Sequence, residues 1–398
     1  MTLHKYHLLI FLLLFTTIGC SESDNDKEYT LLELGDVTGE VTLLGTPLSA
    51  RYADNSPRVY ARNIWDMHAY GSKVYFGGGN SSNSAPAANA GPADLWAYDI
   101  VSEDFIKEYT VADEQIHRIR EFDNQLYIPG HDARESWDFG NFYRLEANEW
   151  KKYRTIPNAI HVYDIYKWER KLFAVIGPQS PATNIQVSND DGLTWKNADY
   201  TNDKNLPVSN AGRIYSIFPF FNELYASYVP YPSTYTGQEN VFYQITDRTE
   251  AKALYDGENG NRIERPVVFK GYTVYIVGST HNDHQYLPLA LRYAKNSQNV
   301  MRYELPANTL PRDILVKGNY LIVLLSKQKG EGTYYNTVML TSDLSVDTVQ
   351  WKELFGFTSE TFARSFEYLN GTFYFGLGCE TDYLSPATGN ILKFDYKL

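Results

Sequence analysis

The sequence of 398 residues contains only two cysteines, Cys20 and Cys379, which excludes a fold held together by several disulfides. Basic residues are scarce beside acidic ones, with 36 Lys and Arg against 48 Asp and Glu, for a formal net charge of −12. A chain of this sign has no overall attraction to nucleic-acid phosphates, so neither DNA nor RNA is expected as a partner. No Gly-rich strand–loop–helix motif is present, and no nucleotide cofactor is predicted.

Long hydrophobic runs are absent after the first twenty residues. Leu8–Phe15 is an unbroken apolar run of eight residues behind a short polar start, which is too short to span a bilayer and is typical of a secretory signal. The string TIGC that ends at Cys20 resembles a bacterial lipobox. That resemblance implies a signal peptide over residues 1–19 and a lipid attached to Cys20, whereas an ordinary secretory signal is the alternative.

The stretch behind Cys20 is acidic and polar. Residues 21–26 read SESDND, which is similar to the export signal that places some lipoproteins on the outer leaflet of Gram-negative bacteria. We therefore expect residues 20–28 to be an acidic linker and the protein to be lipid-anchored at the outer membrane and exposed at the cell surface. A solvated linker without an export role is the alternative interpretation. Lipidation of Cys20 would leave Cys379 without a disulfide partner.

Aromatic residues are abundant, at 15% of the chain, and they recur in one repeated unit. The unit is an apolar strand, a tight turn and an aromatic-rich strand, and seven copies start 46 to 52 residues apart at Ile64, Ile116, Val162, Ile214, Ile263, Leu310 and Phe362. Two further β-like segments follow most copies, and no long segment has helical periodicity. The pattern predicts an all-β protein in which residues 29–398 form a single seven-bladed β-propeller; six or eight blades are the alternative if one copy is miscounted.

The last repeat lacks a fourth strand, because only Asn390–Lys397 follows its strand–turn–strand unit. The surplus β-like segments Tyr29–Leu34 and Glu40–Leu44 can each supply the missing strand. We therefore predict that an N-terminal strand pairs with the last blade and closes the ring, which also covers an exposed sheet edge.

One turn carries a recognisable motif. Residues Ser188–Trp195 read SNDDGLTW and match the pattern S-x-D-x-G-x-T-W. This string resembles the motifs of the Asp-box (BNR) superfamily of propellers, to which sialidases belong, and the resemblance implies fold rather than chemistry because it covers eight residues. Sialidases also have an R-I-P motif, whereas the nearest string here, Arg154–Pro157, has one residue too many, so sialidase activity is not expected.

The lengths of the loops indicate which face of the propeller carries function. Turns between the first and second strands of the repeats are minimal, whereas the loops between the second and third strands are long, as at Asn80–Ala93, His131–Gly140 and Cys379–Gly389. Long loops on a rigid scaffold are common places for binding and catalytic residues. In propellers these loops share a face with the start of each innermost strand, so we expect the site there.

A shared position in the innermost strands is mostly charged. Aligned on the residue before the first turn, the copies have, four residues earlier, Asp66, Arg118, Asp164, Ser216, Arg265, Arg312 and Arg364. Alternate side chains of these strands should point into the central channel. One interpretation is an Arg–Asp network that fills the channel and neutralises itself. The other is a receptor in which the four arginines bind a carboxylate or sulfate of a sugar.

Histidines gather near the same face. His117 and His161 stand at the starts of innermost strands, and long loops carry His131, His281 and His284. Several imidazoles around one channel indicate acid–base chemistry, because histidine titrates near neutrality. The spacing H-x-D-H at His281 also suits a metal, but it matches no known zinc pattern, so no metal is predicted.

Two functions of different class follow. The first is an enzyme acting on an acidic polysaccharide as a lyase, with His161 or His117 as the base, Tyr163 as the acid and the arginines neutralising the uronate; Trp137 would stack on a sugar ring. As a glycosidase, the enzyme would instead use Asp66 and Asp164 as its carboxylate pair. The second is a non-catalytic propeller that binds a glycan or a protein, which needs no base.

Overall fold

The computed structural model describes residues 31–52, 57–81, 89, 91–178, 185–198, 212–220, 222–230, 239–245, 253–259, 261–281, 285–296, 299–346 and 348–398. The chain separates into two compact units, Met1–Leu32 and Glu33–Leu398, and all sheets belong to the second. The only helix among the described residues is the 3-10 helix η1 (Pro57–Arg62). Within the same residues, no helix has the length and apolar character needed to cross a membrane.

Seven four-stranded antiparallel sheets are present in the described part of unit 33–398. The first three consist of β2 (Asp66–Tyr70), β3 (Lys73–Gly77), β4 (Ala93–Asp99) and β5 (Asp104–Val111); β7 (Arg120–Phe122), β8 (Gln125–Pro129), β10 (Phe139–Glu146) and β11 (Glu149–Pro157); and β12 (Ala159–Trp168), β13 (Lys171–Pro178), β14 (Ile185–Ser188) and β15 (Lys196–Asn197). The next three consist of β16 (Gly212–Phe220), β17 (Glu223–Pro230), β18 (Glu239–Ile245) and β19 (Ala253–Asn259); β20 (Asn261–Phe269), β21 (Tyr272–His281), β22 (Gln285–Asn296) and β23 (Asn299–Tyr303); and β24 (Leu310–Lys317), β25 (Tyr320–Gly330), β26 (Thr333–Thr341) and β27 (Lys352–Ser359). The seventh joins β1 (Thr42–Gly45) to β28 (Ala363–Leu369), β29 (Thr372–Leu377) and β30 (Ile391–Asp395).

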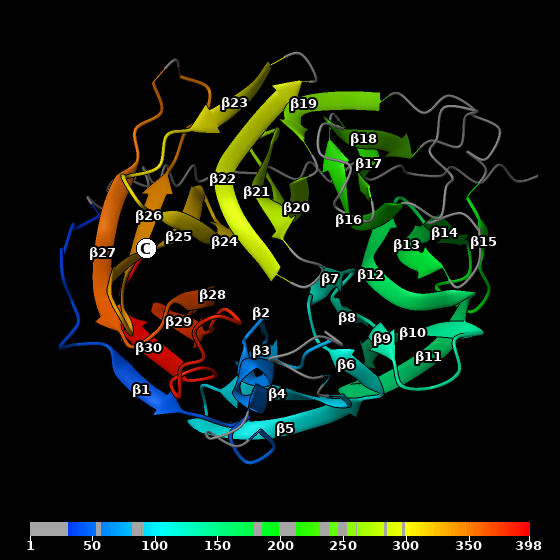
Figure 1. Cartoon of the computed structure of the whole chain (residues 1–398), viewed down its shortest axis with the longest axis horizontal. Coiled ribbons are helices and arrows are strands. Elements are labelled where there is room, and N and C mark those ends of the chain that lie inside the picture. Colours follow the sequence, from blue (N-terminus) through cyan, green and yellow to red (C-terminus); the bar gives the residue numbers. More distant parts are fainter. Residues whose placement is uncertain are drawn as a thin grey trace, which may run out of the picture. The chain divides into compact units, whose positions relative to one another are not determined.

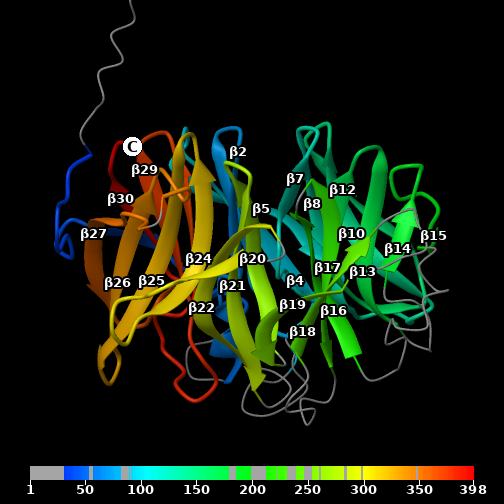
Figure 2. The same cartoon turned by 90° about the horizontal axis from the view of Figure 1, so that it is seen from above.

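The sheets form a β-propeller, with β2, β7, β12, β16, β20, β24 and β28 nearest the centre of the ring (Figure 1). Seen from above, their strands run between the two faces of the ring (Figure 2). Apolar side chains of neighbouring sheets pack together into buried clusters, one of which joins Tyr75 of β3 to Tyr143 of β10. Each sheet therefore buries its faces against its neighbours, as the alternation of apolar residues requires.

Carboxylates of the innermost strands tie consecutive sheets together through one repeated contact. The backbone N–H of Ile119 donates to Asp66 at 2.7 Å, that of Ile217 to Asp164 at 3.1 Å, and that of Phe366 to Asp313 at 3.1 Å. In each pair the donor lies 53 residues beyond the acceptor, so the three carboxylates occupy the same position in the first, third and sixth sheets.

This contact corrects the expected alignment of the charged ring. Asp313 and Ser365 occupy the shared position in the last two sheets, not Arg312 and Arg364, which precede them by one residue. The reason is a β-bulge: the pairing register shifts between Pro311 and Asp313 and again between Ala363 and Ser365. A bulge adds one residue to a strand, and a slip of one residue sends a side chain to the other face.

The N-terminal segment completes the last sheet and also reaches the sheet before it. Thr42 of β1 pairs with Lys393 of β30, which makes β1 the outermost strand of that sheet. Upstream, the N–H of Leu34 donates to Leu354 of β27 at 2.8 Å, and the N–H of Val37 donates to Gly356 at 2.8 Å. The segment thus covers the outer edges of two neighbouring sheets.

Deleting residues 33–45 should lower the free energy of unfolding by roughly 3 kcal/mol, because the segment's backbone hydrogen bonds to β27 and β30 are lost. The exposed edges should also promote aggregation. Urea denaturation and light scattering of the deletion variant measure the two effects. A variant lacking residues 21–30 serves as the control and should unfold like the parent. Equal stability of the two variants would contradict a stabilising role of the contacts that residues 33–45 make with β27 and β30.

The turn at Ser188–Trp195 is held by its own side chains. Asp190 accepts hydrogen bonds from the N–H of Thr194 at 2.9 Å and from its hydroxyl at 2.6 Å. The indole of Trp195 donates to Thr155 of the preceding sheet at 3.0 Å. These bonds fix a hairpin between β14 and β15 and attach it to the preceding sheet, which is a structural role.

The second sheet departs from the regular pattern. The chain that enters it forms β6 (Asp113–Gln115), which pairs with β9 (His131–Ala133) in a separate two-stranded sheet, so β7 is only three residues long. The segment expected to be a long loop after β8 is therefore ordered at its start. In the pairing, Gln115 lies opposite His131, which places both beside the start of the innermost strands.

Candidate functional site

The side chains that converge where the innermost strands begin come largely from β-bulges. Register shifts around Tyr163 and Tyr215 match those around Arg312 and Arg364, so these four residues are the extra members of their strands. A bulge bends the strand and re-aims the side chain, and bulges are common beside active sites. The bulges therefore determine which groups face this end of the channel.

Three imidazoles and a phenol lie in contact; we call His117, His131, His161 and Tyr163 the imidazole cluster. The ring centroids of His117 and His131 are 5.5 Å apart, and those of His131 and His161 are 6.0 Å apart. Tyr163 stacks on His161 at 5.1 Å and meets His131 edge-on at 5.3 Å. Sequence reasoning expected these four residues near one face, and the structure brings them together.

His161 and His117 each have a carboxylate beside them. His161 Nδ1 lies 3.2 Å from Asp132, a residue whose φ of 73° is in the left-handed region. His117 Nε2 lies 3.3 Å from Glu264, and its Nδ1 lies 3.1 Å from the amide of Gln115. Burial lowers the pKa of His117 despite the opposing effect of Glu264. His117 is thus held in place on both sides of its ring.

His131 contacts the rings of the three other members of the cluster. Its side chain is buried, and its Nδ1 has no hydrogen-bond partner among the described residues. Burial first, and then the nearby charges of His117, His161 and Arg262, hold its pKa well below the ordinary value. Its surroundings therefore disfavour the charged form of this imidazole.

Arg262 and Glu264 complete the cluster and were not expected from the sequence. The Arg262 guanidinium pairs with Glu264 at 2.5 Å, and it lies 4.0 Å from the ring centroid of Tyr215 and 3.3 Å from His117 Nε2. Burial alone would raise the pKa of Glu264, but the charges of Arg262, His117 and Arg118 hold it well below its usual range. Arg262 and Glu264 are two residues apart, as are His161 and Tyr163. Looking for this spacing at the start of each innermost strand could have identified Arg262 and Glu264 from the sequence.

Deeper in the channel, arginines and carboxylates neutralise one another. Arg118 contacts Asp164 and Glu264, each at 3.0 Å, and Arg120 contacts Asp164 at 2.7 Å. Arg265 pairs with Asp66 and lies 3.4 Å from Asp313. With Arg262, which pairs with Glu264 at 2.5 Å, the network has four arginines and four carboxylates, so the self-neutralising interpretation applies to this layer.

The channel network limits what its members can do for a substrate. Arg118 and Arg265, predicted to receive an anion, are instead paired within the protein. Asp164 has no exposed surface, and Asp66 and Asp164 both accept backbone N–H groups of the next sheet. A glycosidase pair needs carboxyl groups that reach the sugar, and this arrangement does not offer Asp164 for that role.

The remaining predicted site residues lie apart from the cluster or outside the description. Trp137 is 46% exposed and donates a hydrogen bond of 3.4 Å to Ala133 O, just after β9. His281 ends β21, and its side chain is not described; His284 lies outside the described residues. In the described ranges, no group of three or more His, Cys, Asp or Glu side chains is arranged to hold a metal ion.

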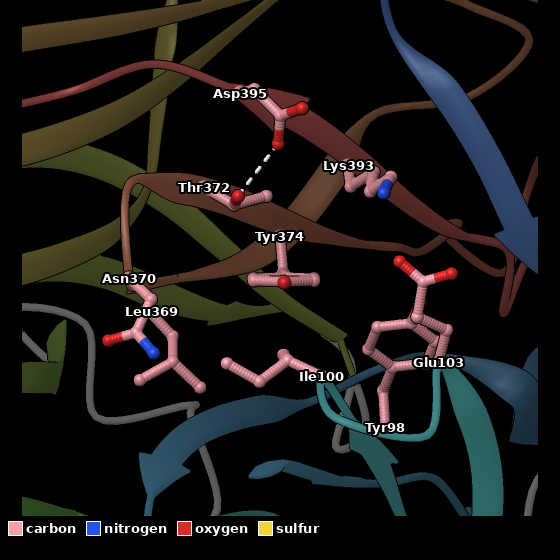
Figure 3. A pocket seen from close by; sticks show the side chains of 9 residues that line it. All are labelled: Tyr98, Ile100, Glu103, Leu369, Asn370, Thr372, Tyr374, Lys393 and Asp395. Atoms are coloured by element: carbon pink, nitrogen blue, oxygen red, sulfur yellow. Dashed lines mark hydrogen bonds between the residues drawn. The ribbon is translucent and has the colours of Figure 1, made fainter. Parts of the chain in front are cut away.

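A cavity of about 260 Å³ lies between the first and last sheets, beside the β28–β29 turn (Figure 3). Its lining includes Tyr98 and Glu103 from the first sheet and Tyr374, Lys393 and Asp395 from the last. Thr372 donates to Asp395 across its edge at 2.7 Å. None of the predicted site residues lines it, so the cavity is separate from the imidazole cluster.

Asp113 lies in β6, where it pairs with Ala133 of β9, and the titration of its buried carboxyl group can be tested. It accepts hydrogen bonds from the hydroxyl of Tyr143 and the amide of Asn141, at 2.5 and 3.0 Å, and burial raises its pKa to about 6. An acid with a raised pKa stabilises the fold while it is protonated, and that stability is lost as the pH rises through about 6.

The variant Asp113→Asn should therefore gain stability relative to the parent as the pH rises from about 4 to about 8, by roughly 3 kcal/mol for a shift of about two pH units. Urea denaturation at several pH values measures the difference. Asp99→Asn, at the end of β4, is the control and should show no such trend. A constant difference across the pH range would contradict the buried titration.

Comparisons with known proteins agree with the fold and assign no family. No family model matches the chain, and no curated protein matches it. Among solved structures, a chain of the mitotic checkpoint complex has a TM-score of 0.51 at 8% identity, over 98% of this chain and 100% of that one. A puromycin-hydrolysing peptidase of Mycobacterium tuberculosis has a TM-score of 0.50 at 13% identity, over 91% of this chain and 54% of that one. The polysaccharide lyase Uly1 has a TM-score of 0.46 at 8% identity, over 85% and 90%. At such identities the likeness shows a β-propeller and nothing about chemistry.

Proposed function

We propose that this β-propeller binds an acidic polysaccharide where its innermost strands begin and cleaves it by β-elimination. The observation that carries the proposal is the imidazole cluster: His161 lies beside Asp132, stacks on Tyr163, and is next to His131, while the ion pair of Arg262 and Glu264 lies against His117. Acid–base groups in contact with one another and with a cation are what elimination next to a carboxylate requires.

The roles follow from the positions of the groups. Arg262, whose Nε pairs with Glu264 at 2.5 Å, would turn toward the uronate carboxylate when the polymer binds and lower the cost of forming a carbanion at C5. His161 would accept the C5 proton, because Asp132 beside Nδ1 favours the tautomer in which Nε2 has the lone pair. The electrons left by that proton form the C4–C5 double bond as the C4–O bond breaks. Tyr163 would give its proton to the leaving oxygen, so the reaction consumes no water.

The second candidate is a binding protein that captures an acidic glycan without cleaving it. The contacts of His117 favour this binding function, because both of its ring nitrogens already have neighbours within 3.3 Å. An imidazole that is fixed in this way can recognise a ligand without transferring a proton. In either case we propose that Cys20 is lipidated and holds the protein at the outer membrane. Loss of labelled palmitate in Cys20→Ser would support that anchor.

The deciding experiment is incubation of the protein with alginate, polygalacturonate and sulfated uronate polymers. A lyase produces unsaturated ends that absorb in the near ultraviolet together with an equal number of reducing ends. Reducing ends without absorbance would indicate a glycosidase and overturn the elimination. Retention on a polymer-containing gel without any product would leave the glycan-binding alternative.

A further inference from the structure

Arg312 and Arg364 form a second centre of positive charge beside the imidazole cluster; we call them the arginine pair. They begin neighbouring innermost strands, and their side chains are 4% and 8% exposed. Both contact the same oxygen of Glu380, at 3.0 and 3.3 Å. No other acidic side chain in the described part of the chain pairs with them, so two guanidinium groups share one carboxylate. The pair therefore has one positive charge in excess.

Aromatic rings set the orientation of both guanidinium groups. Arg312 lies 3.5 Å from the ring centroid of Phe362, and Arg364 lies 4.5 Å from that of Trp65. Each Nε has a partner at 2.7 Å, the hydroxyl of Ser326 for Arg312 and the amide oxygen of Asn63 for Arg364. A guanidinium stacked on a ring and held at Nε presents its terminal nitrogens edge-on.

Hydrogen-bonding capacity remains at that edge. Arg312 uses Nε and Nη1, and Arg364 uses Nε and Nη2, the latter toward Cys379 O at 2.8 Å as well as Glu380. Arg312 Nη2 and Arg364 Nη1 have no partner among the residues that the structure describes. Burial lowers the pKa of Arg312 to about 10, with Glu380 opposing and Arg364 adding to the shift.

We propose that the arginine pair is an anion subsite, which binds a carboxylate or sulfate on the sugar next to the one held at the imidazole cluster. Glu380 then occupies this subsite in the absence of polymer. Trp65 connects the two places, because its ring lies 6.0 Å from that of His117 as well as 4.5 Å from Arg364. The inference rests on the proposed function for the position of the polymer, and it assigns the substrate class: a chain with anionic groups on adjacent sugars.

The test is the variant Glu380→Gln, which removes the competing carboxylate and keeps its shape. Its affinity for dextran sulfate or for polygalacturonate, measured by affinity electrophoresis, should rise about tenfold, which corresponds to about 1.4 kcal/mol. The polymer that gains distinguishes sulfate from carboxylate recognition. Arg312→Lys should lose a similar factor, because lysine cannot bind an anion through two parallel N–H groups. Glu121→Gln, whose carboxylate contacts His68 instead, is the matched control and should leave affinity unchanged.

A second measurement guards against a simple folding defect. Glu380→Gln leaves two buried arginines without a counterion, so its melting temperature should fall in chloride buffer and recover when sodium sulfate is added, beyond the recovery of Glu121→Gln. Unchanged affinity for both polymers together with no specific rescue by sulfate would overturn the subsite, even if the protein cleaves a polymer. Increased affinity without product from any polymer would support the subsite and reject the lyase.

Discussion

His161→Ala should lower kcat for polymer cleavage by about 10²–10⁴-fold, the range typical for loss of a general base. His161 lies 3.2 Å from Asp132 and stacks on Tyr163, so its replacement removes both the proposed proton acceptor and the group that aligns the proposed acid. Retention on a polymer-containing gel should change little, because the positive charges of Arg262 and the arginine pair remain. Initial rates from near-ultraviolet absorbance measure the loss.

His68→Ala is the matched control for this prediction. His68 belongs to β2 and pairs with Glu121 at 2.9 Å, away from the imidazole cluster, so its loss should leave kcat within about twofold. A companion variant, Asp132→Asn, should reduce kcat less than His161→Ala, since it keeps the imidazole and weakens only its orientation. Full activity of His161→Ala would exclude it as the base and move that role to His131 or His117.

Asp164→Ala should lower the free energy of unfolding by about 3–5 kcal/mol, the cost of removing one partner from a buried ion pair. Asp164 has no exposed surface, contacts Arg118 and Arg120 at 3.0 and 2.7 Å, and accepts the N–H of Ile217 from the next sheet. Its loss leaves two buried guanidinium groups with less counter-charge and breaks a link between two sheets. Urea denaturation followed by tryptophan fluorescence measures the change.

The isosteric variant Asp164→Asn separates the two causes. It can still accept the N–H of Ile217 but has no charge for the arginines, so its stability should lie between those of the parent and Asp164→Ala. Asp190→Ala, in the exposed turn after β14, is the control and should cost much less, because its partners Ser188 and Thr194 are local. A loss below about 1 kcal/mol in Asp164→Ala would contradict a network that depends on this carboxylate.

Local pattern was informative wherever neighbours in the sequence are also neighbours in space. The alternation of apolar residues and the minimal turns indicate the strands, and the side chains of Ser188, Asp190 and Thr194 form their hairpin with hydrogen bonds over two to four residues. The position of His117 and His161 at strand starts likewise depends only on where each repeat begins. These features depend on residues that are close together in the sequence. They can therefore be predicted without knowing which distant segments pair in the folded protein.

Pairing between sheets, in contrast, was decided by the tertiary structure. Counting residues back from a turn assigned Arg312 and Arg364 to the channel ring, but one bulge in each strand gives that position to Asp313 and Ser365. Arg118 was a candidate anion receptor until Glu264, 146 residues away, proved to be its partner. The sequence by itself determined the repeated β unit, its turns and the face that carries the histidines. Which arginines are neutralised, and which keep charge for a ligand, depends on bulges and on contacts across the ring, because a one-residue change of register re-aims a side chain and long-range ion pairs leave no local pattern.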